Sequence, residues 1–374
     1  MGCIDNPTLF LKLYMVNFPQ QYQYQDSAYA YAHGEAIGHG LLKVNPGDFK
    51  VTEKLGFDLS GEGEHTYLYI EKVGINSEWL ARQLARFAGV GAGDVGFAGL
   101  KDRQAITRQW FSIWLPGKPD PDWQQFAASL DEPVRVLEVN RHSRKLKRGG
   151  LAGNDFDILI RDANIDNSLL HARIEQINLY GVPNYFGPQR FGHNGDNISH
   201  CLAMFEKQRK FKRQQKSIYL SAARSFIFNE ILSRRVQAGT WRNMLQGDIA
   251  KLDGSNSFFH VNAVDQQIEQ RTLEMDIHPS AILWGKGRRQ ATGVAQQLEN
   301  QTQQAWPLLC NGLEQFGVDI DYRNLRVAVI NLVVSHYGNE LSLQFFLQKG
   351  AYATSVLREI VALSPLNEPD DLNQ

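Results

Sequence analysis

Residues 182–192 read VPNYFGPQRFG, and the character of the chain changes on either side of this stretch. Two prolines and two glycines fall within its 11 residues, a density typical of a connection between structural units. Before it, short alternating patterns predict strands; after it, longer helical patterns prevail until alternation returns near residue 341. Strands therefore flank a helical middle region, which predicts an α+β domain with a second domain inserted in it.

The region before this stretch alternates apolar and polar residues over several short segments. The alternation predicts strands at 41–44, 65–70, 105–115 and 156–160. The sequence Asn-Pro-Gly-Asp at 45–48 predicts a tight turn that leads into Phe49. Within 105–115, Phe111 and Ile113 are expected to lie on a single apolar face.

Helices are predicted where apolar residues recur every three or four positions between a capping residue and a glycine. We expect one helix with Ser77 as its N-cap and Gly89 as its stop, and another over 168–180. A third is expected over 221–238, capped by its first serine. A short capped helix over 354–363 follows the last predicted strand.

The composition is that of a folded protein. The chain has 374 residues, 43% of them hydrophobic, with 39 Lys and Arg against 40 Asp and Glu. This length allows two domains that each bury a core. The formal charge of -1 excludes a polycation, so any binding to nucleic acid must depend on local basic patches.

The three cysteines, Cys3, Cys201 and Cys310, are far apart in the sequence and form no C-x-x-C pair. This spacing argues against a disulfide framework and a zinc site, so we expect a cytoplasmic protein without a metal ion. The apolar residues 8–18 are too few to span a membrane and contain Lys12. Neither a signal peptide nor a membrane anchor is therefore expected.

Two basic clusters stand out against the nearly neutral overall charge. The first consists of Arg141, Arg144, Lys145, Lys147 and Arg148, and the second of Lys207, Arg209, Lys210, Lys212, Arg213 and Lys216. Either cluster can neutralise phosphates of a nucleic acid, and either can equally be a solvated surface. Their occurrence together favours a polyanionic partner, for whose bases the aromatic residues offer stacking surfaces.

Gly91, Gly93 and Gly96 match the G-x-G-x-x-G pattern of dinucleotide-binding proteins. In those proteins a strand precedes the glycines and a helix follows them, so that the pyrophosphate meets the N-terminus of the helix. Here the predicted order is the reverse, with a helix before and a strand after. We therefore interpret the segment as a loop, and a dinucleotide-dependent oxidoreductase is the less favoured alternative.

Asp102 is the carboxylate that the pattern singles out. It follows the glycine-rich loop, precedes the aromatic strand, and lies between Lys101 and Arg103. A loop in this position can project a carboxylate into a cleft, while neighbouring cations keep it ionised. The alternative is an ordinary solvated loop charge.

Four longer motifs resemble the TruD family of tRNA pseudouridine-13 synthases. They are GFAGLKDRQA from Gly96, GNDF from Gly153, VPNYFGPQRFG from Val182 and ATSVLRE from Ala353. The resemblance extends from about residue 39 to about residue 360 and implies the pseudouridine synthase fold, a mixed sheet with flanking helices and an inserted α/β TRUD domain. The implied parts are an N-terminal arm at 1–32, a catalytic domain at 33–180 and 331–374, and the inserted domain at 181–330.

The resemblance also implies roles for individual residues. The family's nucleophilic aspartate corresponds to Asp102, and its basic partner to Lys43. The implied substrate-contacting residues are Phe49, Asn154, Phe156 and Tyr352. The family has a phenylalanine where this chain has Tyr352, a change that preserves stacking and adds a hydroxyl group that needs a partner.

The implied activity is isomerisation of uridine 13 in the D arm of tRNA to pseudouridine. Uracil is detached from C1′, rotated and rejoined through C5 without redox change, so no cofactor is expected. A carboxylate either attacks C1′ or supports loss of the base through a glycal route, and both remain open. The target base must be flipped out of the folded RNA.

The resemblance implies tRNA as the partner of a monomer that needs no protein partner. The alternative from another functional class is a non-catalytic RNA-binding protein of the same fold.

Overall fold

The computed structural model describes residues 28–207 and 210–364. Positions 1–27 of the predicted N-terminal arm therefore lie outside the described residues, as does Arg209 of the second basic cluster. The described chain forms two compact units. We call residues 36–178, 329–353 and 360–364 the large-sheet unit, and residues 28–35, 179–328 and 354–359 the small-sheet unit.

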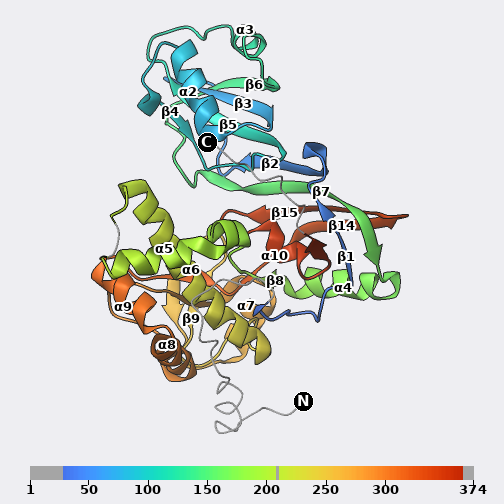
Figure 1. Ribbon diagram of the computed structural model, residues 1–374, viewed down its shortest axis with the longest axis vertical. Helices are drawn as coiled ribbons and strands as arrows, with labels where there is room; N and C mark the ends of the chain where they lie inside the picture. The colour runs from blue at the N-terminus through green and yellow to red at the C-terminus, as the bar shows by residue number, and fades with distance from the viewer. Residues whose placement is uncertain (1–27, 208–209, 365–374) are drawn as a thin grey trace. The chain divides into compact units, whose positions relative to one another are not determined.

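The large-sheet unit is built on a sheet of ten strands among the described residues (Figure 1). Seven strands follow one another in the order β14, β15, β7, β2, β5, β3, β6, while β1 pairs with β7 and β16, and β4 pairs with β5. Their bounds are β1 Gly38–Leu42, β2 Phe49–Leu55, β3 His65–Val73, β4 Val95–Phe97, β5 Ile106–Trp114, β6 Val134–His142, β7 Leu151–Ile165, β14 Ile330–Tyr337, β15 Glu340–Gln348 and β16 Ala362–Ser364. The ladders of β1 with β16 and of β2 with β5 are parallel, and the others described are antiparallel. The sheet is therefore mixed, as predicted.

β3 and β5 lie side by side within the sheet and are buried on both faces. Leu68 and Phe111 belong to a cluster that includes apolar residues of α2 (Ser77–Phe87). Tyr67, Trp110 and Leu146 belong to a second cluster. The expectation of a single apolar face for 105–115 was wrong, because this second cluster covers Trp110 as well.

The N-cap of helix α2 is one residue earlier in the chain than predicted. Its N-cap is Asn76, whose Oδ1 accepts hydrogen bonds from the N–H groups of Glu78 at 2.8 Å and Trp79 at 3.3 Å. Ser77 is buried instead, and its hydroxyl donates to Oε1 of Gln109 at 2.8 Å. The serine that was expected to cap the helix thus joins it to β5.

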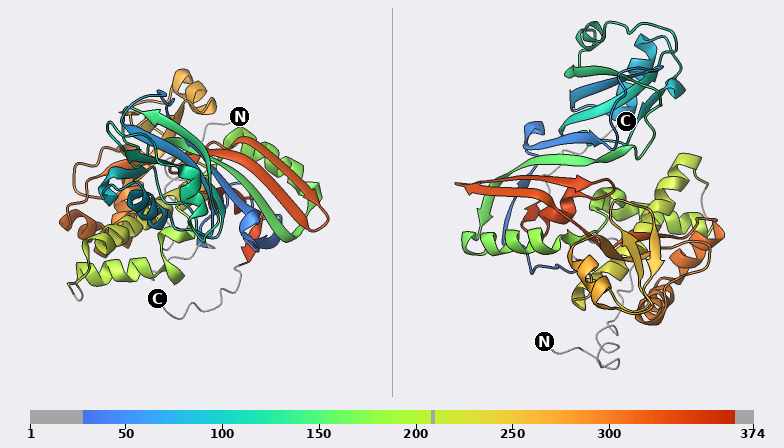
Figure 2. Two further views of the ribbon diagram at one scale, coloured as in Figure 1. Left: turned by 90° about the horizontal axis from the view of Figure 1, so that it is seen from above. Right: turned by 180° about the vertical axis from the view of Figure 1, so that it is seen from behind.

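Two further helices begin in the large-sheet unit, α3 (Trp123–Ala128) and α4 (Asn167–Tyr180). Figures 1 and 2 show α4 alongside β14. Oδ1 of Asn167 lies 2.7 Å from Nδ1 of His336 on that strand. The glycine-rich segment contributes the 3₁₀ turn η3 (Ala92–Asp94) and then β4, so a helix precedes the glycines and a strand follows them.

The small-sheet unit combines an antiparallel sheet with helices. In the described chain its four-stranded sheet has the order β10 (Phe258–His260), β9 (Ile249–Leu252), β11 (Ile277–Leu283), β12 (Asp321–Asn324). Its helices are α5 Asp196–Phe205, α6 Arg213–Gln237, α7 Gln266–Leu273, α8 Gly293–Ala305, α9 Pro307–Gln315 and α10 Ala353–Leu357. The 25-residue helix α6 contacts α5, α8, α9 and β11, so it forms the centre of this unit.

The stretch 182–192 opens with β8 (Val182–Pro183), which pairs antiparallel with β13 (Arg326–Val327). The preceding Gly181 has φ +70°, and a Cβ there would lie 2.3 Å from the carbonyl oxygen of Val327. Glycine is therefore required where the chain enters this pairing. The ladder brings the two ends of the 182–327 segment together.

Two helices differ from their predicted bounds. α6 begins at Arg213, and Ser221 lies inside it, where its hydroxyl accepts a hydrogen bond from Arg190. α10 ends at Leu357, because Ala362–Ser364 form β16 and pair with β1. In both cases tertiary partners outweigh the local capping pattern.

No helix in residues 28–207 and 210–364 is long and apolar enough to cross a membrane. Within the same residues no group of three or more His, Cys, Asp or Glu side chains is arranged to hold a metal ion. Cys201 and Cys310 are buried free thiols.

Candidate active site

The carboxylate of Asp102 is paired with the ammonium group of Lys43. Asp102 lies in the loop between β4 and β5, and its Oδ2 accepts a hydrogen bond from Nζ of Lys43. Its Oδ1 accepts a second from the N–H of Gln104 at 3.0 Å. The Lys43 and Asp102 side chains are 14% and 19% exposed, so the carboxylate is oriented and still accessible. The structure thus joins the two residues expected to be nucleophile and basic partner.

Lys43 owes its position to the turn between β1 and β2. It has φ +60°, a left-handed conformation that is uncommon for a residue with a side chain. The turn η2 (Pro46–Asp48) follows and returns the chain to Phe49. Nζ of Lys43 lies 4.5 Å from the centroid of the Phe49 ring, within the range of a cation–π contact.

Asp48 anchors this turn. Its buried carboxylate accepts a hydrogen bond from the N–H of Asn45 at 2.7 Å and is paired with Arg161 of β7 at 2.8 Å. Burial alone raises the pKa of Asp48, but the hydrogen bonds and charge of Arg161, together with Asn45, outweigh it and lower the pKa overall. The turn that carries Lys43 is therefore fixed to the sheet by an ionised group.

Three phenylalanines on adjacent strands form a row of ring contacts that begins beside Lys43. We call Phe49, Phe156 and Phe345 the aromatic wall. The rings of Phe49 and Phe156 meet edge to face with centroids 6.1 Å apart, and those of Phe156 and Phe345 are stacked at 5.3 Å. Phe156 of β7 is the register partner of Phe345 on β15. Phe345 lies on the strand that the alternation returning near residue 341 predicts, and strand register, which sequence reasoning lacked, places it here.

Asn154 and Tyr352 are the two remaining residues with an expected substrate contact. Asn154 lies on β7, in register with Glu53 on β2, and its buried Oδ1 accepts no hydrogen bond from any described residue. Tyr352 lies partly buried in the turn between β15 and α10. The substrate roles of all six residues stay predictions.

A buried ion pair lies beside Asp102. Nζ of Lys101 and Oε2 of Glu53 are 2.5 Å apart, with side chains 7% and 0% exposed. The N–H of Trp110 donates to the other oxygen of Glu53 at 3.3 Å. Burial raises the pKa of Glu53, and the charge of Lys101 opposes that rise. The sequence interpretation placed Lys101 beside Asp102 to keep it ionised, but its ion pair is with Glu53.

Further hydrogen bonds fix the loop that carries Asp102. The main-chain N–H of Lys101 donates to the hydroxyl of Ser77 at 3.3 Å, and Nε2 of Gln109 donates to the carbonyl of Gly99 at 2.5 Å. Arg103 donates to the carbonyl of Gly74 at 3.3 Å. Helix α2, strand β5 and the turn after β3 thus all hold residues 99–103. A loop held this way presents its carboxylate in one orientation.

Lys72 is a buried lysine of the same region. It is 1% exposed and donates to the carbonyl of Ile75 at 2.7 Å. Burial, reinforced by the charge of Lys101 and opposed by that of Asp102, lowers its pKa to about 8. Sequence reasoning missed this residue, because a lysine on a strand is ordinarily exposed.

The two predicted basic clusters differ in their surroundings. In the first, Arg141 is paired with Asp120 at 3.1 Å, Lys145 donates to the carbonyl of Gly93, and Arg148 lies 3.7 Å from Glu78. Arg144 and Lys147, the remaining members, are exposed. In the second cluster the described members Lys207, Lys210, Lys212, Arg213 and Lys216 are all exposed.

The comparisons with known proteins agree with one another. The family model described as tRNA pseudouridine synthase D (TruD) matches residues 27–205 and 198–360. The tRNA pseudouridine synthase D of Methylococcus capsulatus is 45% identical over 91% of this chain and 96% of its own. That of Nitrosococcus oceani is 45% identical over 89% and 93%.

A solved structure shares the fold. It is the crystal structure of a Methanosarcina mazei protein described as a tRNA pseudouridine synthase D, with a TM-score of 0.66 and 22% sequence identity. The match covers 92% of this chain and 98% of that one. From the family model and these relatives it follows that this chain belongs to the tRNA pseudouridine synthase D (TruD) family.

Proposed function

We propose that this protein, as a pseudouridine synthase and hence an isomerase, converts uridine 13 in the D arm of tRNA to pseudouridine with Asp102 as its nucleophile. Membership of the family supports the reaction and the RNA substrate. The observation that carries the role of Asp102 is its partly exposed carboxylate, paired with Lys43 next to a wall of aromatic rings. Nucleophilic catalysis requires an anion held in place and accessible, and this arrangement supplies both.

The reaction needs the bond between N1 of uracil and C1′ to break and a new bond between C5 and C1′ to form. In one route an oxygen of Asp102 bonds to C1′ as uracil leaves with the bonding electrons. In the glycal route the base leaves as a proton is lost from the sugar. When C5 of the rotated base bonds to C1′, the bond between Asp102 and C1′ breaks in the first route, and C2′ regains the proton it lost in the glycal route. In both routes C5 then loses its own proton. No redox partner enters this balance, so we propose that no cofactor takes part.

Lys43 has two functions in this proposal. Its ammonium group donates a hydrogen bond to Oδ2 of Asp102 and so orients the carboxylate. Its contact with the Phe49 ring ties the ion pair to the aromatic wall. The ion pair and the buried ring of Phe49 are thereby held at one place.

Phe49, Phe156 and Tyr352 would bind the detached uracil by stacking, and Asn154 would bind its edge. Oδ1 of Asn154 is an acceptor without a donor among the described residues, and a buried acceptor of this kind is costly unless it is satisfied. The N–H groups of uracil are suitable donors. Because uracil must turn before it rejoins the sugar, a wall of rings that holds it without covalent bonds suits the reaction.

The second basic cluster supports binding of the RNA backbone. Lys212 is the N-cap of α6, Arg213 is its first residue, and no acidic residue lies in the first turn. Cations are disfavoured at a helix N-terminus, where the helix dipole is positive. Both charges therefore add to a positive potential that phosphate would relieve. In the first cluster, by contrast, Arg141 and Lys145 already have partners.

We propose the domain layout and cellular setting as follows. Residues 33–180 and 331–374 form the catalytic domain and 181–330 the inserted TRUD domain, supported by the ladder that joins β8 to β13. The two compact units differ from this layout in that residues 33–35 and 354–359 group with the small-sheet unit. The enzyme acts as a monomer in the cytoplasm without a protein partner. The buried free thiols of Cys201 and Cys310 are compatible with a reducing compartment.

The test is release of tritium from tRNA labelled at C5 of uridine. Wild-type protein should release label from one uridine in the D arm, and Asp102→Asn should reduce the rate by on the order of 10⁴-fold or more while still binding tRNA. Asp94→Asn, in the exposed turn η3, is a matched control and should retain full activity. Binding of tRNA without any release of label by the wild-type protein would favour the non-catalytic alternative.

A further inference from the structure

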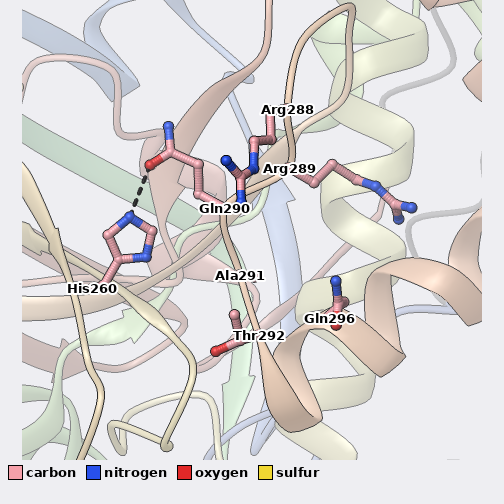
Figure 3. A pocket seen from close by; sticks show the side chains of 7 residues that line it. All are labelled: His260, Arg288, Arg289, Gln290, Ala291, Thr292 and Gln296. Carbon is pink, nitrogen blue, oxygen red and sulfur yellow. Dashed lines mark hydrogen bonds between the residues drawn. The ribbon is translucent and has the colours of Figure 1, made fainter.

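The small-sheet unit contains a pocket that neither the sequence interpretation nor the proposed catalytic role uses. Its volume is about 430 Å³. The polar side chains around it are those of His260, Arg288, Arg289, Gln290, Thr292 and Gln296 (Figure 3). They come from β10, from the segment before α8, and from the first turns of α8. A pocket of this size can enclose a small polar ligand.

The lining of this pocket is cationic. No carboxylate occurs among the described residues that line it. Arg288 is exposed and makes no hydrogen bond or ion pair with any described residue. An arginine side chain has five N–H donors in a planar fork, a geometry that matches the oxygens of a phosphate group. Arg288 is thus a cation at the pocket without an anion of its own.

Arg289 is partly buried, and its Nη1 donates no hydrogen bond to any described residue. Its guanidinium group lies 5.1 Å from the centroid of the Trp284 ring, and Figure 3 shows it extending away from Arg288. Burial raises the pKa of Glu299 to about 7, and the charge of Arg289 opposes this rise. Arg289 therefore contributes positive potential near the pocket, and Arg288 is the group available for direct contact.

Hydrogen bonds fix the wall of the pocket. Nε2 of His260 and Oε1 of Gln290 are 3.0 Å apart, and the N–H of Gln290 donates to the hydroxyl of Tyr322 at 2.9 Å. The N–H of Thr292 donates to the carbonyl of Gly247 at 2.9 Å. The segment that carries Arg288 is therefore joined to its surroundings on both sides of residue 291. A preformed wall reduces the entropy that a ligand must overcome on binding.

The first turn of α8 reinforces the positive potential. Thr292 is the N-cap of this 13-residue helix, and its side chain makes no capping hydrogen bond. The N–H groups of a helix N-terminus carry a partial positive charge, which attracts anions when no side chain caps them. This partial charge adds to the charge of Arg288. The helix N-terminus alone would not make a binding site.

We propose that this pocket binds a phosphate group of the RNA substrate, with Arg288 as the contacting residue. The proposal rests on the proposed function for the identity of the RNA, since the lining itself selects for phosphate. A free phosphate compound offers the same chemistry and is the competing source. The pocket would extend the RNA-binding surface beyond the two basic clusters.

The experiment compares Arg288→Ala with Arg82→Ala in the full-length chain. Arg82 is an exposed arginine of α2 without a hydrogen bond or ion pair to any described residue, so its loss changes the charge equally. The Kd for tRNA is measured by filter binding at several salt concentrations, independently of catalysis. Arg288→Ala should raise Kd about fivefold to tenfold and reduce the log–log salt slope by about one unit, as expected for a lost phosphate contact. Arg82→Ala should change neither.

A second arm separates the two sources of phosphate. The melting temperature of wild-type protein and of Arg288→Ala is measured with inorganic phosphate and with uridine monophosphate. Stabilisation of the wild type alone, with an unchanged Kd for tRNA in the variant, would assign the pocket to a free phosphate compound and overturn the RNA assignment. Equal Kd values and equal melting temperatures in both proteins would overturn the site altogether.

Failure of the pocket proposal can be distinguished from failure of the proposed function. If wild-type protein binds tRNA but releases no tritium from it, the isomerase activity is refuted, while the effect of Arg288→Ala on Kd still tests the pocket. If label is released and Arg288→Ala binds tRNA as the wild type does, the pocket proposal alone fails.

Discussion

Lys101 and Asp102 are neighbours in the chain, but their ion pairs occupy different surroundings. Lys101 pairs with Glu53 in the interior, where the two side chains are 7% and 0% exposed. Asp102 pairs with Lys43 at 14% and 19% exposure, next to the aromatic wall. A buried pair without access cannot react with a substrate, whereas a partly exposed carboxylate can. The difference supports our proposal that one pair positions the loop and the other takes part in the chemistry.

Breaking the buried pair should have the largest effect on stability. Lys101→Met leaves the carboxylate of Glu53 buried without its cation, and such a change costs about 3–5 kcal/mol of the free energy of unfolding. Urea denaturation of the variant and the wild type measures the loss. The tritium-release rate should fall as well, because the loop that carries Asp102 loses an anchor.

The double variant Glu53→Gln with Lys101→Met is the control for this prediction. It removes both charges, so it should recover most of the stability that the single variant loses. Equal instability of the single and double variants would contradict a role for the charge pair itself.

Breaking the pair of Lys43 and Asp102 should reduce activity more than it reduces stability. Lys43→Met is expected to lower the free energy of unfolding by less than Lys101→Met does, because the Asp102 side chain is 19% exposed and water can reach it, whereas Glu53 is fully buried. It should lower kcat about 100-fold, equivalent to about 2.7 kcal/mol of activation free energy, because the proposed nucleophile loses its orienting cation. Single-turnover tritium release and urea denaturation measure the two quantities.

Lys50→Met is a matched control for Lys43→Met. Lys50 lies on β2, exposed and paired with Asp157 at 3.1 Å, so its loss also removes an ion pair of a lysine. It should leave kcat unchanged. A loss of stability by Lys43→Met as large as that of Lys101→Met would remove the distinction between the two pairs.

Lys72 offers a smaller effect that depends on pH. Burial lowers its pKa from 10.5 to about 8, so between these values the folded state binds fewer protons than the unfolded state. Stability therefore rises with pH across this window and is lost as pH falls towards 8. Lys72→Met lacks this titration, and its stability relative to wild type should fall by about 3 kcal/mol between pH 7.5 and 10.5.

Urea denaturation at a series of pH values measures this difference, with Lys50→Met as the exposed control. Parallel stability curves for the wild type and Lys72→Met would show that Lys72 does not titrate in this range. Burial would then not disfavour the charged form of Lys72.

The fold was predictable in outline from local patterns. Alternation at 65–70, 105–115 and 156–160 predicted β3, β5 and β7, and the glycines at 89 and 181 marked helix ends correctly. Local capping rules were less reliable: Asn76 and not Ser77 caps α2, because Ser77 has a tertiary partner in Gln109. The last helix was overextended, because the pairing of β16 with β1 depends on a strand more than 300 residues away.

The candidate site was predictable where it follows motifs and unpredictable where it depends on register. Asp102, Lys43, Phe49 and Phe156 come together as expected. Glu53 was missed, because a glutamate on an alternating strand is normally exposed, and only the neighbouring β5 and the loop of Lys101 bury it.

The amino-acid sequence alone determined the kinds of chemistry available: a carboxylate in a short loop, a lysine before a turn, aromatic residues on strands, and a connection at 182–192. These follow from residue type and from interactions between near neighbours. Only the tertiary structure decided which lysine meets which carboxylate and which pair is buried. The physical reason is that ion pairing and burial depend on distances set by strand register, which joins residues far apart in the chain.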